Sequence, residues 1–188
     1  MRVLLLRDEP CTRARVHAVA LAAAHPEIEV ALARQGGPGG ESLDQEWQLG
    51  ERPARRLREA IAEFAPDVVH SYGPAGALTV CVIELTAGRL PVIHDLDAPA
   101  QVERGLELRA IEESDALVVA SQGLLEDLGG RTTLPPLTCV VPNYPLAREL
   151  PRDEWHLGAE ANIDLLVSLY QSLAREPLAG IASELQGR

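Results

Sequence analysis

The sequence contains no lysine, and all 17 of its basic residues are arginine. This absence excludes a Schiff-base lysine, the lysine of a Walker-type phosphate loop and a Ser-Lys catalytic pair. Aromatic residues are also scarce, at 3% of the 188 residues. Proteins that bind single-stranded nucleic acid stack the bases on aromatic rings, so the scarcity argues against that class of function.

Positive charge is in short supply as well. The formal net charge is -11 at pH 7, whereas binding to a phosphate backbone depends on clustered basic residues. We therefore expect no nucleic-acid partner.

Cysteine is sparse too, with only Cys11, Cys81 and Cys139, which are far apart and form no Cys-x-x-Cys pair. Neither a disulfide framework nor a zinc site is indicated, and we expect no cofactor and no metal. The apolar run at residues 3–6 is too short for a signal peptide, and no stretch has the length of a membrane span. These observations predict a cytoplasmic protein.

Short runs rich in Val, Ile and Leu alternate with segments of helical period, a pattern typical of βαβ units and a parallel sheet. The expected strands are 2–6, 29–33, 68–70, 91–94, 116–120 and 137–141. The expected helices are 13–24, 52–64, 75–87, 100–113, a short one from 121, and 160–173. Residues 35–50, which include Gly-Gly-Pro-Gly-Gly, are expected to form a loop. The predicted fold class is α/β, with a single Rossmann-like, doubly wound parallel sheet of six or seven strands.

Ligands of such a sheet bind beyond the carboxyl ends of its strands. Polar residues that reach this edge define a candidate site, whose predicted members are Arg7, Arg13, His94, Ser121 and Asn143. Other roles stay open for two of them. The His94 imidazole could bond to a neighbouring group instead of lining a cleft, and Ser121 could cap the next helix. His70 lies inside an apolar strand and is interpreted as a core residue.

Four motifs carry a resemblance to a known family. Residues 66–73 read PDVVHSYG, 88–95 read GRLPVIHD, 113–121 read ESDALVVAS and 140–143 read VVPN. In order and spacing they resemble motifs of the family-four retaining glycosyltransferases, which have the GT-B fold. The resemblance covers roughly residues 1–147.

The resemblance implies two Rossmann-like domains that face each other across a cleft, of which the first binds the acceptor and the second the nucleotide sugar. It also implies that His94 lies beside the transferring sugar, which makes His94 the candidate catalytic residue. One departure concerns the loop after the first strand. Where the family has a Gly-Gly loop for the donor diphosphate, this chain has Arg-Asp-Glu-Pro-Cys-Thr-Arg at 7–13, and two carboxylates repel a diphosphate.

Only 45 residues follow Asn143, too few for a donor-binding domain. We therefore predict a Rossmann-like domain at 1–150 and a helical tail at 151–188 that packs on the same domain. The tail carries an apolar stripe of helical spacing that must bury itself against another surface. Its members are Ile163, Leu166, Val167, Tyr170 and Leu173. The same segment resembles the terminal helix of GT-B enzymes, which crosses back onto the first domain.

Three hypotheses for the function follow. The first is an acceptor-binding domain of the hexosyltransferase class, inactive alone, that acts as a subunit of a split glycosyltransferase with a donor-domain protein as partner. The second is a non-catalytic binding or assembly module derived from a glycosyltransferase, in effect a pseudoenzyme, with a homo-oligomer among its expected forms. The third is an independent small-molecule enzyme on the same fold. A sugar or glycosyl acceptor is the expected ligand of the first.

Overall fold

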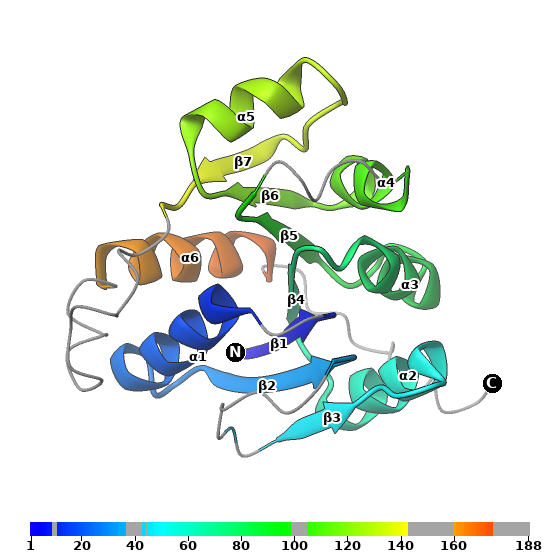
Figure 1. The fold of residues 1–188 in the computed structure, drawn as a ribbon. Coiled ribbons are helices and arrows are strands. Elements are labelled where there is room, and N and C mark those ends of the chain that lie inside the picture. Colours follow the sequence, from blue (N-terminus) through cyan, green and yellow to red (C-terminus); the bar gives the residue numbers. More distant parts are fainter. Residues whose placement is uncertain (9–10, 37–42, 44, 99–104, 143–159, 175–188) are drawn as a thin grey trace.

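A computed structural model gives the fold (Figure 1), and it describes residues 1–8, 11–36, 43, 45–98, 105–142 and 160–174. The strands are β1 Arg2–Arg7, β2 Glu29–Arg34, β3 Glu46–Gln48, β4 Val68–Tyr72, β5 Val92–Leu96, β6 Ala116–Val119 and β7 Leu137–Val140. The helices are α1 Thr12–Ala24, α2 Pro53–Phe64, α3 Gly76–Thr86, α4 Gly105–Glu113, α5 Gln122–Gly129 and α6 Glu160–Leu173.

All seven strands form one parallel sheet in the order β3-β2-β1-β4-β5-β6-β7. The chain first winds outward from β1 to β3 and then returns to build the other half from β4, so the order reverses between β1 and β4. The predicted fold class is confirmed. One strand was missed, because β3 lies within the segment that the sequence predicted to be a loop.

The helices cover both faces of the sheet (Figure 1). Helices α1 and α6 lie on one face, which we call the α1/α6 face. Helices α2, α3, α4 and α5 cover the other, which we call the α3/α4 face. Two-sided burial explains why the central strands are almost continuously apolar. None of the helices in the described ranges is long and apolar enough to cross a membrane.

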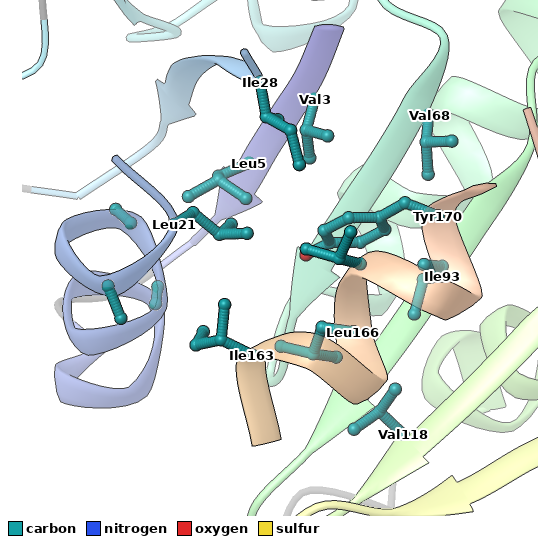
Figure 2. Close-up of a cluster of buried hydrophobic side chains, with 14 of the residues drawn as sticks. Val3, Leu5, Leu21, Ile28, Val68, Ile93, Val118, Ile163, Leu166 and Tyr170 are labelled. Atoms are coloured by element: carbon teal, nitrogen blue, oxygen red, sulfur yellow. The ribbon is translucent and has the colours of Figure 1, made fainter. Parts of the chain in front are cut away.

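Helix α6 occupies residues 160–173, as its apolar stripe predicted. Figure 2 shows Leu166 and Tyr170 turned toward side chains of the strands, and Ile163 on the side of α6 that faces α1. These three are fully buried, and Val167 is 5% exposed. Burying a side chain of this size stabilises a fold by about 1.5–3 kcal/mol, so α6 is an integral part of the core. Of the tail, only this helix and Ala174 fall within the described ranges, and the boundary at residue 150 stays a prediction.

Candidate functional site

Strand geometry divides the predicted site between the two faces of the sheet. Successive side chains of a strand point to opposite faces. On β5, Ile93 packs in the core of the α1/α6 face, so Asp95 shares that face and His94 points to the α3/α4 face. The fifth strand therefore presents its two neighbouring polar residues to different sets of helices.

On the α1/α6 face, Arg13 and Asp95 form a buried ion pair. Nε of Arg13, in the first turn of α1, lies 2.8 Å and 2.9 Å from the two carboxylate oxygens of Asp95. The same guanidinium donates a 2.8 Å hydrogen bond to the carbonyl oxygen of Val141, directly after β7. Arg13 is 6% exposed and Asp95 1%. Arg13 thus ties the start of α1 to the carboxyl ends of β5 and β7.

The pair continues into His70 and Tyr170. Nε2 of His70 lies 3.2 Å from Asp95 Oδ2, and Nδ1 lies 2.6 Å from the hydroxyl of Tyr170 on α6. An ionised carboxylate only accepts hydrogen bonds, so His70 carries its proton on Nε2. Nδ1 is then an acceptor, and the Tyr170 hydroxyl donates to it. This relation fixes both the tautomer of His70 and the position of α6.

Two further residues extend the cluster. The hydroxyl of Tyr72 lies 2.9 Å from Nδ1 of His17 on α1 and 3.3 Å from Nδ1 of His70. The rings of His70 and Tyr72 are stacked with centroids 4.3 Å apart. We call these six side chains, which connect α1, β4, β5 and α6, the buried polar cluster: Arg13, His17, His70, Tyr72, Asp95 and Tyr170.

Burial determines the ionisation of the cluster. It would raise the pKa of Asp95, but the Arg13 guanidinium and the hydrogen bond from His70 outweigh it and bring that pKa down to about 2. Burial lowers the pKa of His17 to about 3 and also lowers the pKa of His70. It raises the pKa of Tyr72 and of Tyr170. At neutral pH one ion pair is therefore surrounded by neutral rings.

On the α3/α4 face, His94 is held by two helices. Its Nε2 lies 2.7 Å from Oε1 of Glu107 on α4, and its Nδ1 lies 3.2 Å from Oγ1 of Thr79 on α3. The other oxygen of Glu107 accepts a 2.8 Å hydrogen bond from the amide of Gly76, the first residue of α3. His94 is 0% exposed and Glu107 3%. Both nitrogens of the imidazole are therefore engaged inside the protein.

Three predicted residues remain, of which Arg7 is in register with Tyr72 of the cluster where β1 pairs with β4. Arg7, at the end of β1, is fully buried. Ser121 is exposed, and its hydroxyl accepts a hydrogen bond from the amide of Leu124 at 3.2 Å, so it caps α5. Asn143 lies outside the described residues. The structure thus does not bring Arg13, His94 and Ser121 together into one group, and their role toward a ligand stays a prediction.

Asp95, Glu107 and Tyr170 were not among the predicted site residues. The expected strand at 91–94 stops just before Asp95, whereas Asp95 lies inside β5. The sequence did offer a signal for Asp95, because this charged residue comes directly after the expected strand at 91–94. No cluster of His, Cys, Asp and Glu suited to a metal ion occurs in the part of the chain that the structure describes.

Comparison with known proteins finds a likeness at the level of structure. The chain is similar to a sucrose-phosphate synthase from Thermosynechococcus elongatus. The TM-score is 0.64 at 14% sequence identity, and the match covers 92% of this chain and 99% of that chain. The likeness is one of fold. Both this structure and the next are GT-B or GT-B-like, consistent with half of a GT-B fold.

The second neighbour is the UDP-GlcNAc 2-epimerase from Neisseria meningitidis, bound to UDP-GlcNAc. Here the TM-score is 0.51 at 15% identity, with 76% of this chain and 47% of the epimerase chain covered. This chain therefore spans about half the length of the epimerase. No protein-family model and no curated protein matches the sequence.

Proposed function

We propose that this chain is a glycosyltransferase-like acceptor-binding domain that is inactive alone and works with a donor-binding domain supplied by a separate protein. The observation that carries the proposal is the extent of the fold match, which takes in 99% of the sucrose-phosphate synthase chain. The four sequence motifs lead independently to the same fold. A sugar or another glycosyl acceptor is the proposed ligand.

Helix α6 supports this assignment. Its apolar side chains are buried on the sheet that carries the four motifs. In the GT-B enzymes that the sequence resembles, the terminal helix likewise crosses back onto the first domain. On this proposal the domain that precedes the terminal helix in those enzymes is the part that a second protein supplies here.

A second candidate is a non-catalytic binding or assembly module. The burial of His94, with both ring nitrogens engaged, favours it. So does the sequence after β1, where acidic residues replace the glycines of the family's diphosphate loop. Both candidates predict that the isolated chain transfers no sugar, and they differ in whether a donor-binding partner exists.

Purification from the native cell separates the two candidates. The chain, carrying an affinity tag, is isolated under mild conditions, with the tag alone as the control, and its companions are identified by mass spectrometry. We expect one protein in fixed ratio that binds a nucleoside-diphosphate sugar, and we expect the reconstituted pair to transfer the sugar. Recovery of the chain alone or as a homo-oligomer would overturn the split enzyme and support the module.

A further inference from the structure

The contact between His94 and Glu107 has the form of a binding site with its ligand in place. Both oxygens of the Glu107 carboxylate accept a hydrogen bond. Oε1 accepts from Nε2 of His94, and Oε2 accepts from the backbone amide of Gly76, the first residue of α3. The amides at a helix N-terminus point outward and attract negative charge. Two independent elements, β5 and α3, thus converge on the two oxygens of one carboxylate.

The site is fitted closely to α4. A Cβ atom added at Gly76 would lie 2.7 Å from the Cα and 2.9 Å from the amide nitrogen of Glu107, and closer still to Oε2. Backbone atoms cannot rotate away as a flexible side chain can. Gly76 therefore allows α4 to approach α3 closely enough for Glu107 to reach both partners.

From these contacts we infer that Glu107 is a built-in blocking ligand of His94. The Gly76 amide and the His94 imidazole form a receptor for a small carboxylate, and α4 fills it from within the protein. While α4 is seated, no acceptor group reaches Nε2 of His94, because Oε1 of Glu107 lies 2.7 Å from it. The carboxylate receptor is inferred from the contacts alone. Only the statement that Glu107 keeps an acceptor away from His94 rests on the proposed function.

Chemical rescue tests the receptor. Glu107→Ala removes the carboxylate and leaves space for formate, whose two oxygens reproduce the pattern of Glu107. The melting temperature is measured in sodium formate and in sodium chloride at equal ionic strength. At ten times its Kd, formate should raise the Tm of Glu107→Ala by about 3–6 °C above the chloride value, and the rise should saturate.

Glu112→Ala is the matched control, since Glu112 lies on the same helix and is exposed. For Glu112→Ala, and likewise for the unaltered protein, the Tm in sodium formate should equal the Tm in sodium chloride. A folded Glu107→Ala protein with no formate-specific rise would overturn the inference. If Glu107→Ala does not fold, Glu107→Gln carries the test through the ¹⁵N resonances of the His94 ring. The Nε2 signal should move in Glu107→Gln and stay in place in Glu112→Gln, and an unchanged signal would overturn the inference.

These results are independent of the proposed function. A formate response without a donor-binding partner leaves the receptor standing and removes the split enzyme. A donor-binding partner without a formate response leaves the proposed function standing and removes the blocking role of Glu107.

Discussion

The hydroxyl of Tyr170 lies 2.6 Å from Nδ1 of His70, although the two residues are 100 positions apart in the sequence. Tyr170→Phe keeps the ring and removes the donor, which leaves a buried acceptor without its closest partner. We expect a loss of about 1–3 kcal/mol in the free energy of unfolding, measured by urea denaturation. Tyr170→Ala should cost about 3–5 kcal/mol, because it also opens a cavity. Leu165→Ala, at a 41% exposed position of α6, should change the value little, and an equal loss there would contradict the assignment.

The ion pair of Arg13 and Asp95 gives a second prediction. Asp95→Asn leaves the Arg13 guanidinium buried without its countercharge, which costs about 3–5 kcal/mol. For a chain of this size we expect a fall of roughly 10 °C in Tm, seen by calorimetry. Asp164→Asn is the control, because that carboxylate is 73% exposed and contacts His25 at the surface. Equal melting temperatures for the two variants would refute the burial of the pair.

Histidine burial predicts loss of stability in mild acid. Folded His17 has a pKa of about 3, whereas an unperturbed histidine has one of 6.5. Between these values the unfolded chain binds the proton and the folded chain does not. Stability is therefore full above about pH 6.5 and decreases as the pH falls toward 3, by up to about 1.4 kcal/mol per pH unit. Urea titrations from pH 8 to pH 5 measure this slope, and His17→Gln should reduce it. An unchanged slope in that variant would show that His17 is not responsible.

Removal of α6 should prevent stable folding. A chain that ends at Pro151 lacks four buried side chains, Ile163, Leu166, Val167 and Tyr170, and uncovers the apolar strand residues beneath them. Soluble yield and circular dichroism measure the outcome, with a chain that ends at Ala174, and so keeps α6, as the control. A truncated protein that is a well-folded monomer would mean that α6 is a partner-binding element and not part of the core.

The isolated chain should bind nucleoside-diphosphate sugars weakly. On the proposed function the donor contacts come from another domain, and an exposed diphosphate gains little from charge pairing in water. Calorimetric titration with several such sugars should show no binding in the micromolar range. Micromolar binding or sugar transfer by the pure chain would refute the division of labour between two proteins.

The sequence predicted a helix well where its apolar residues repeat at helical spacing over several turns. The stripe from Ile163 to Leu173 spans about three helical turns, and its expected bounds agree with α6. Strand β3 was missed because Glu46–Gln48 is only three residues long and carries no alternating apolar pattern. Its pairing comes from the free edge of β2, where Leu32, Ala33 and Arg34 align with it. Such a strand is determined by its neighbour more than by its own residues.

The candidate site could be predicted only in part, because its contacts join distant positions. Arg13 and Asp95 are separated by 82 residues and His70 and Tyr170 by 100. The sequence located polar residues at strand ends, but it did not say that His94 and Asp95 face different helices. Strand alternation separates them once the bounds of β5 are known, and the sequence placed the end of this strand two residues too early, at His94 instead of Leu96.

The bond between Tyr170 and His70 also bears on how the protein is made. A ribosome synthesises all seven strands before it reaches α6, so Arg13, His70 and Asp95 are all present in the chain before Tyr170, which completes their cluster. Until then the strands beneath α6 keep apolar and polar groups uncovered in water. The domain therefore completes its core only after α6 has been synthesised, and until then the nascent chain should need protection from aggregation.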